Sequence, residues 1–234
     1  MPVADGHGVH PLTVPAVDSA AVAPQAPRRP FNEAVTRFWS FAAPAYDVQY
    51  LQQLVYRPAQ DELIAALRAH APARVADIAC GTGILADRIE RELAPEAVYG
   101  VDMSQGMLAQ ARERSSRVQW LTGPAEQLPF ADGALDALVT SSAFHFFNQP
   151  AAVREFHRVL APGGMAAVTA MSPRLPDPLH RLSGLRWNPA KQPTPSEMRT
   201  LFTDAGFTVA DQHRVARPAW TLIVSDLITV GVKP

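Results

Sequence analysis

The segment from Val75 to Gly83 constrains this chain more than any other. It reads VADIACGTG, an apolar run that breaks into a turn of small residues with two glycines. Glycine permits positive φ and has no Cβ, so such a turn brings bare backbone close to a ligand. The helical-looking run from Ile84 to Leu93 follows at once, and its first turn would present free N–H groups to that ligand. The segment therefore predicts a loop that binds a nucleotide cofactor.

The chain around this loop alternates between strand-like and helix-like patterns. A helix is expected to open at Pro58, since proline suits the first turn, with Leu63, Ile64 and Leu67 facing inward. Strands are predicted near 74–78, 97–101, 118–121, 135–140 and 165–171, and helices near 84–93, 105–114 and 150–160. This alternation predicts an α/β fold, with a parallel sheet that is covered by helices.

The C-terminal part departs from that alternation. Thr194, Pro195 and Glu197 have the spacing of a capping box, so a helix is expected to begin there and to end near Gly206. Two strand-like runs follow, at 207–215 and 220–230, joined by the short segment 217–219. So short a connection joins only antiparallel neighbours.

The glycine turn alone fits two kinds of cofactor. Residues 81–86 match the dinucleotide pattern GxGxxG/A, and Asp102 follows at about the expected 20 residues. Asp77, inside the strand end, and the segment GPAEQLPF at 123–130 are not required by a pyrophosphate-binding loop. These two features favour a different nucleotide cofactor.

Five motifs in order carry a resemblance that covers about 31–234. They are FAAPAYD at 41–47, DIACGTG at 77–83, GVDMSQGMLAQAR at 100–112, GPAEQLPFADGALDALVTSSAFHFF at 123–147 and RVLAPGGMAAVT at 158–169. Together they resemble the class I S-adenosylmethionine-dependent methyltransferases, in particular the small-molecule enzymes related to the quinone and biotin pathways. The resemblance implies a Rossmann-like, doubly wound, seven-stranded and mostly parallel sheet, with an antiparallel C-terminal strand and helices on both faces.

The resemblance also implies S-adenosylmethionine as cofactor and methyl transfer to a small molecule, with oxygen as the first candidate atom. It assigns cofactor binding to Tyr46, Asp77, Ala79, Cys80, Gly81, Gly83, Asp102, Met103, Met107, Ala125, Glu126 and Ser141. Asp102 would accept both ribose hydroxyls, and Asp77 would shape the loop near the amino-acid end of the cofactor. The alternatives are structural: helix-capping acids for Asp77 and Asp102, and core filling for Tyr46 and the two methionines.

Two residues depart from the family pattern. Ala79 stands where the family usually has glycine, and alanine fits only if that residue does not need positive φ. Pro124 stands where relatives commonly carry an aspartate that binds the adenine amino group, and a proline side chain cannot accept this bond. Adenine recognition is therefore expected to rest on the Ala125 backbone, on Glu126 or on stacking.

His145 is the candidate catalytic residue. It follows the predicted strand 135–140 at the sheet edge where ligands bind, and an ordinary histidine pKa of about 6.5 suits a general base. The alternative is a structural histidine that donates to a backbone carbonyl within the neighbouring phenylalanines. The methyl acceptor would lie among aromatic residues and the loop 172–194, although aromatic residues in such a pattern more often belong to the core. The aromatic residues are Trp39, Phe41, Tyr50, Tyr56, Phe144, Phe147 and Trp187.

Composition is consistent with one folded domain over 31–234 behind a disordered leader at 1–30, which six prolines interrupt. Residues 31–70 would form helices that cover the site. The 21 basic and 22 acidic side chains argue against nucleic acid as a partner. The single cysteine suits the cytoplasm, no apolar run is long enough to span a membrane, and no histidine or carboxylate spacing suggests a metal.

Two other functions remain open at this point. Pro124 leaves room for a catalytically silent protein that binds S-adenosylmethionine as a scaffold or regulatory subunit. A nicotinamide-dependent oxidoreductase is the second alternative, although no Tyr–Lys catalytic pair is evident.

Overall fold

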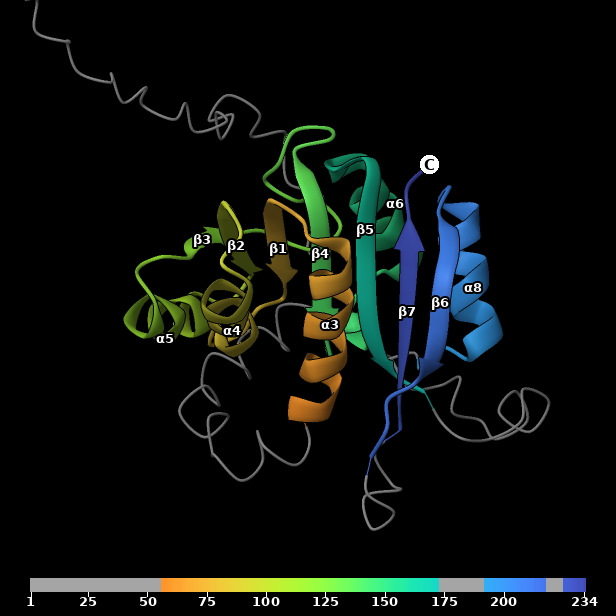
Figure 1. Cartoon of the computed structure of the whole chain (residues 1–234), viewed down its shortest axis with the longest axis horizontal. Coiled ribbons are helices and arrows are strands. Elements are labelled where there is room, and N and C mark those ends of the chain that lie inside the picture. The colour runs from red at the N-terminus through yellow and green to blue at the C-terminus, as the bar shows by residue number, and fades with distance from the viewer. Residues whose placement is uncertain (1–55, 173–191, 218–224) are drawn as a thin grey trace, which may run out of the picture.

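A seven-stranded sheet organises the protein, as the computed structural model shows for residues 56–172, 192–217 and 225–234 (Figure 1). The strand order is β3-β2-β1-β4-β5-β7-β6. The strands are β1 (Arg74–Ile78), β2 (Ala97–Asp102), β3 (Gln119–Thr122), β4 (Leu135–Ser141), β5 (Leu160–Met171), β6 (Thr208–Arg214) and β7 (Asp226–Val232). The expected leader, the expected helices before residue 56 and most of the loop 172–194 lie outside the described residues.

Strand direction separates this sheet from a dinucleotide-binding fold. The strands from β3 to β5 pair in parallel, whereas β7 pairs antiparallel with both β5 and β6. A dinucleotide-binding sheet has the order 3-2-1-4-5-6 and carries no such inserted strand. The predicted mostly parallel sheet with an antiparallel C-terminal strand is confirmed.

Helices cover both faces of the sheet. The helical elements are α3 (Arg57–His70), α4 (Ile84–Leu93), α5 (Gln105–Arg114), the 3-10 helix η2 (Phe144–Phe146), α6 (Gln149–Val159) and α8 (Pro195–Asp204). The apolar sides of α3 and α4 pack on one face, where Leu63 and Ile89 are buried against β1, β4 and β5. Phe156 of α6 and Phe202 of α8 are buried on the opposite face. The predicted capping box is present, with Thr194 and Glu197 bonded reciprocally.

Two strand boundaries differ from the sequence prediction. β5 begins at Leu160 rather than near 165, because Leu160 pairs with Leu135 across an irregularity before the regular ladder starts at Met165. β7 begins at Asp226 rather than at 220, because its first partner is Met171, the last residue of β5. Most of the predicted link at 217–219 lies outside the described residues, whereas the predicted antiparallel pairing of the two strands holds.

Candidate functional site

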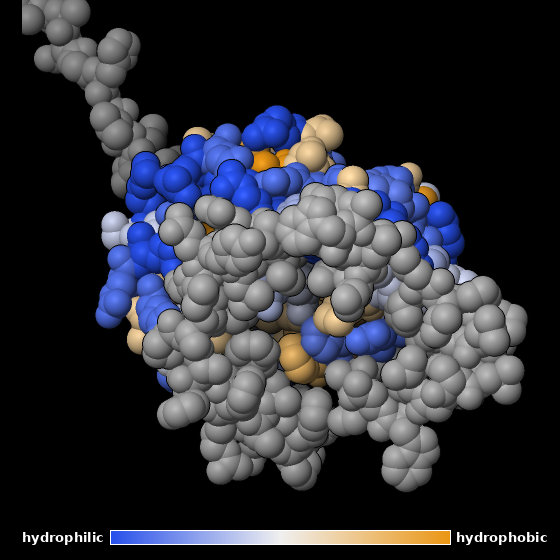
Figure 2. All heavy atoms as spheres, turned by 90° about the horizontal axis from the view of Figure 1, so that it is seen from below, coloured by the Kyte–Doolittle hydropathy of each residue, from blue (hydrophilic) through white to orange (hydrophobic). Residues whose placement is uncertain are grey.

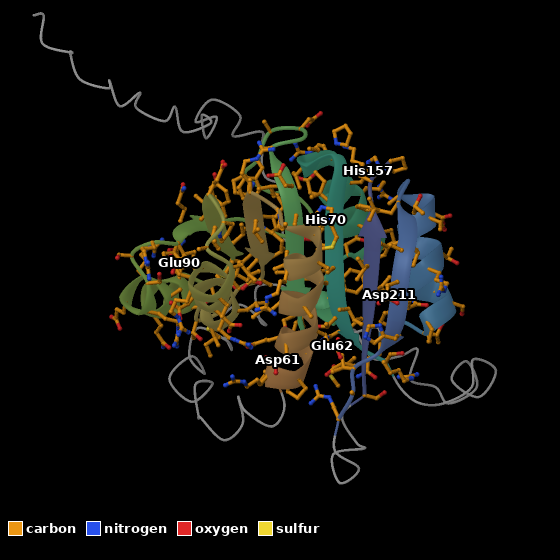
Figure 3. All side chains as sticks on the ribbon, in the orientation of Figure 1. Asp61, Glu62, His70, Glu90, His157 and Asp211 are labelled. Atoms are coloured by element: carbon orange, nitrogen blue, oxygen red, sulfur yellow. The ribbon has the colours of Figure 1, made fainter. Side chains whose placement is uncertain are left out.

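The sequence-predicted site residues gather at one edge of the sheet. β1, β2, β4 and β5 run in the same direction, so their carboxyl ends share this edge, which is the lower one in Figure 1. Figure 2 looks onto it and shows apolar and polar atoms side by side. Asp61 and Glu62 mark the end of α3 near this edge, and His70 marks the far end (Figure 3). Open α/β sheets bind ligands at this edge.

The glycine loop between β1 and α4 is held by backbone geometry. Ala79, Gly81 and Gly83 all have positive φ, at 56°, 56° and 79°. The Cys80 N–H donates to the Val101 carbonyl at 3.1 Å, which fastens the loop to β2. The condition for a comfortable alanine at position 79 is therefore not met, and Ala79 occupies the left-handed region that favours glycine.

Gly81 and Gly83 have different surroundings. Among the described residues, a Cβ on Gly81 would have only the Met107 sulfur within 4 Å, at 4.0 Å. A Cβ on Gly83 would lie 2.4 Å from the Trp120 ring. Sequence reasoning assigned both glycines to close approach by the cofactor. The described residues leave that space at Gly81 and give Gly83 a packing reason, the aromatic ring of β3.

Asp102 ends β2 beside this loop. Its Oδ2 accepts the Gly81 N–H at 2.9 Å, and its Oδ1 accepts the Ser104 N–H at 2.8 Å. Burial raises the pKa of Asp102, and the backbone donors, Ser104 first, oppose that rise. Each oxygen has a second lone pair, so the carboxylate could still accept from a ligand. Met107 is buried next to Gly81, and Met103 is half-buried.

Asp77 lies in β1 and is almost completely buried, with 2% of its surface exposed. Its Oδ2 has no hydrogen-bond partner within the described part of the chain, whereas the Ala86 backbone in α4 supports the carboxylate. Burial, and next the charge of Asp102, raise the pKa of Asp77 well above its ordinary value. Burial likewise raises the pKa of the adjacent Cys80 thiol. A buried carboxylate oxygen without a partner suits a cationic or donor group of a ligand.

The predicted adenine segment begins directly above Asp102. The Gly123 N–H donates to the Asp102 carbonyl at 3.3 Å, and Pro124 and Gln127 close a turn in which Ala125 is buried. Glu126, which was expected near adenine, instead accepts the Asn148 N–H on Oε1 at 2.6 Å. The segment is thus bonded to the part of the chain that follows His145.

The acceptor side of the edge, at the ends of β4 and β5, carries polar atoms without protein partners. Ser141 Oγ, His145 Nδ1 and Ser172 Oγ are buried and unbonded among the residues that the structure describes. Burial lowers the pKa of His145 below its ordinary value. Ser142, between β4 and η2, has a φ of 56°, and its N–H donates to the Thr169 carbonyl at 3.2 Å. Left-handed non-glycine residues of this kind cluster at functional sites.

Some aromatic residues of the predicted acceptor pocket lie elsewhere. Phe144 is fully buried in the core, and Phe147 packs against both Phe144 and Phe156. Phe144 is therefore a core residue, whereas Phe147 is only partly buried at the border of the core. Tyr46, Trp39, Phe41, Tyr50 and Trp187 lie outside the described residues, and so do most residues of the loop 172–194.

The sequence analysis did not identify two residues that support the glycine loop, Arg114 and Trp120. Arg114, at the end of α5, donates from Nε to the Thr82 carbonyl at 2.8 Å. The Trp120 ring packs on Gly83 and on Gly100, where a Cβ would lie 2.3 Å from it. A glycine within a predicted strand, as at Gly100, was the available signal, since it marks close approach of another group.

The other histidines that the structure describes lie away from this edge or at the surface. His70 and His157 lie at the edge opposite the site in Figure 3, and His213 bonds Asp211 at the surface. Within 56–172, 192–217 and 225–234, no group of three or more histidine, cysteine or acidic side chains could hold a metal ion. In the same ranges no helix has both the length and the apolar character that crossing a membrane requires.

Known proteins give an independent comparison. Residues 76–168 match the family model described as "Methyltransferase domain". The chain is 31% identical over 155 residues to the malonyl-[acyl-carrier protein] O-methyltransferase of Dechloromonas aromatica, which covers 66% of this chain and 57% of that protein. It is 39% identical over 108 residues to the demethylmenaquinone methyltransferase of Thermus thermophilus, and this match covers 44% of this chain and 49% of that protein. The chain thus spans about half the length of these curated relatives.

A solved structure supports the fold. Geranyl diphosphate C-methyltransferase from Streptomyces coelicolor, in a complex that contains S-adenosyl-L-homocysteine, superposes with a TM-score of 0.69 at 15% identity. The superposition covers 90% of this chain and 100% of that one. Identity this low supports the fold alone, while the family match and the curated relatives support the family. Over residues 76–168 the chain matches the methyltransferase domain family, and its fold is similar to that of a methyltransferase whose structure contains S-adenosyl-L-homocysteine.

Proposed function

We propose that this chain transfers a methyl group from S-adenosylmethionine to a small-molecule acceptor. The observation that carries the proposal is a pair of acids at the glycine loop: Asp102, which accepts the Gly81 N–H, and Asp77, whose buried Oδ2 has no partner among the described residues. Asp102 would accept the ribose hydroxyls on its remaining lone pairs. Asp77 would face the ammonium of the amino-acid end, which supplies the missing partner. Met103, Met107 and the Ala125 backbone would contact the adenine.

We further propose oxygen as the methyl acceptor. The sulfonium supplies the leaving group, so the protein must align the acceptor and exclude water. A hydroxyl loses its proton as its oxygen is methylated, and His145 Nδ1, a buried atom without a partner among the described residues, could take that proton. The lowered pKa of His145 keeps this imidazole neutral, and able to accept, at neutral pH.

The relatives leave carbon as the competing acceptor atom. The printed name of one curated relative specifies O-methylation, whereas the solved neighbour is a C-methyltransferase. An apolar or aromatic acceptor stays a prediction, and Phe144 does not support it because its ring is fully buried in the core.

A second candidate is a protein that binds the cofactor without transferring its methyl group. Pro124 favours it, because no carboxylate stands at the position where relatives commonly bind the adenine amino group. The two candidates share the cofactor and differ only in turnover.

Calorimetry with S-adenosylmethionine, S-adenosylhomocysteine and NAD tests the cofactor. We expect micromolar-range binding of the first two and no heat with NAD, and heat with NAD alone would overturn the proposal. Incubation with methyl-labelled cofactor and a panel of hydroxylated and carbon-acid small molecules then tests turnover. Label in an ether or ester supports oxygen, label on carbon corrects the atom, and binding without any labelled product supports the second candidate.

A further inference from the structure

Glu126 joins two parts of the site that the sequence keeps apart. It lies in the predicted adenine segment, and its Oε1 accepts the N–H of Asn148 at 2.6 Å. Asn148 lies immediately before α6 and three residues after His145. A hydrogen bond from a backbone amide to a carboxylate is charge-assisted and stronger than a neutral one. One side chain therefore connects the cofactor side of the edge to the acceptor side.

On the cofactor side, the segment that carries Glu126 is continuous with the ribose site. Its first residue, Gly123, bonds the backbone carbonyl of Asp102, and a turn from Pro124 to Gln127 sets the direction of Glu126. Contact of adenine with this turn would therefore restrict Glu126 as well.

On the acceptor side, His145 is held between two anchored ends. Before it, the N–H of Ser142 bonds Thr169 on β5. After it, Asn148 is the N-cap residue of α6, and its N–H bond to Glu126 ties the start of that helix to the cofactor segment. Within the turn, Phe146 and Phe147 donate back to Ala143 and Phe144, so the short helix η2 moves as a unit. The position of Asn148 thus sets the position of the imidazole.

We propose that Glu126 is a positioning residue, which transmits cofactor docking from the segment 123–128 to the turn that carries His145. The proposal rests on the proposed function, since it takes the cofactor to bind against this segment. It adds to the prediction that Glu126 lies near adenine, because its Oε1 accepts the Asn148 N–H at 2.6 Å while its second oxygen can still accept from a ligand. Binding of cofactor and placement of the base would then be coupled.

The test follows the imidazole of His145 by NMR while S-adenosylhomocysteine is added at constant pH. The His145 signal is assigned from its loss in His145→Gln. Glu126→Ala removes the bond to Asn148, and Glu126→Gln keeps an oxygen that can accept it. Glu155→Ala is the matched control, because Glu155 Oε1 accepts the Leu128 N–H at 2.7 Å and so holds the same segment without contacting Asn148.

We expect S-adenosylhomocysteine to displace the His145 signal in the native chain, in Glu126→Gln and in Glu155→Ala. In Glu126→Ala the displacement at saturation should fall to less than half, and affinity should weaken by about tenfold, the order expected for loss of one hydrogen bond to a charged group. A full displacement in Glu126→Ala overturns the proposal, and so does a native signal that saturating ligand does not move.

Hydrogen exchange at the Asn148 amide of the native chain keeps the test decisive if Glu126→Ala does not fold. Ligand should slow this exchange, and an unchanged rate at saturation overturns the coupling. Failure of the native chain to bind S-adenosylhomocysteine at all is a different result, because it removes the proposed function on which the coupling rests.

Discussion

The cofactor half and the acceptor half of the site are built differently. Around the glycine loop, protein groups satisfy most polar atoms: both oxygens of Asp102 accept backbone amides, and Arg114 holds the Thr82 carbonyl. At the ends of β4 and β5, Ser141 Oγ, His145 Nδ1 and Ser172 Oγ have no partners among the described residues. The exception in the cofactor half is Asp77 Oδ2, which the proposal pairs with the cofactor.

This difference indicates that the cofactor half is arranged for binding before a ligand arrives. Bonded, packed groups need little rearrangement when a ligand arrives, and preorganisation lowers the cost of binding. Buried polar atoms without partners are costly until a ligand supplies them. We infer that changes in the cofactor half alter affinity and stability, whereas changes in the acceptor half alter turnover.

The largest expected effect lies in the acceptor half. His145→Gln should lower turnover by roughly 10² to 10⁴, the usual contribution of a positioned base, and leave cofactor affinity unchanged. Only neutral imidazole accepts a proton, so the native rate should rise with pH through the His145 pKa, which burial places below its ordinary value. Steady-state rates between pH 5 and 8 and calorimetry measure both. Turnover within a few-fold of native, with an unaltered pH profile, would make His145 structural.

The next effect concerns the best-bonded group of the cofactor half. Asp102→Ala removes the acceptor for Gly81 and Ser104 and for the proposed ribose hydroxyls. Leaving such donors unpaired costs about 1–3 kcal/mol, so calorimetry should show S-adenosylhomocysteine affinity lowered by about 5- to 150-fold. Asp102→Asn keeps one acceptor oxygen and should lower the affinity by a smaller factor. Native affinity in Asp102→Ala would remove this residue from the site.

A pair of glycines separates packing from backbone strain. Gly83 and Gly163 share a φ of 79°, but a Cβ at Gly83 would lie 2.4 Å from the Trp120 ring, whereas nothing lies within 4 Å at Gly163. Gly163→Ala should cost only the left-handed strain, about 1–2 kcal/mol. Gly83→Ala should add about 1–3 kcal/mol for overpacking. Urea unfolding of both variants compares them, and equal losses would show that Trp120 moves aside freely.

The smallest expected effect is a gain in stability. Ala79→Gly removes the strain of an alanine in the left-handed region, which is worth about 1–2 kcal/mol. The added glycine also raises the conformational entropy of the unfolded chain, which lowers stability by about 0.4–1 kcal/mol. The net gain should be about 0.5–1 kcal/mol in the free energy of unfolding by urea. Ala71→Gly is the matched control, because Ala71 has a φ of 51° and caps α3 directly after His70, which Figure 3 shows at the end of α3 away from the site. A loss of stability at position 79 alone would show that the methyl group of Ala79 packs usefully.

The amino-acid sequence by itself determined the order of the elements and the kind of loop between β1 and α4. Short-range signals carry this information: the period of apolar residues, the capping box at Thr194 and the small residues at 79–83. They depend on neighbours within one or two turns of chain, so a single sequence displays them.

Only the tertiary structure decided what those residues meet. It assigned Gly83 to the Trp120 ring and Glu126 to the Asn148 amide, and it started β7 opposite Met171. It also set the positive φ of Ala79. Each outcome depends on a contact or a chain direction that forms only when segments distant in the sequence pack together. The spacing of apolar residues predicts which residues are buried, but it does not predict which residues they contact.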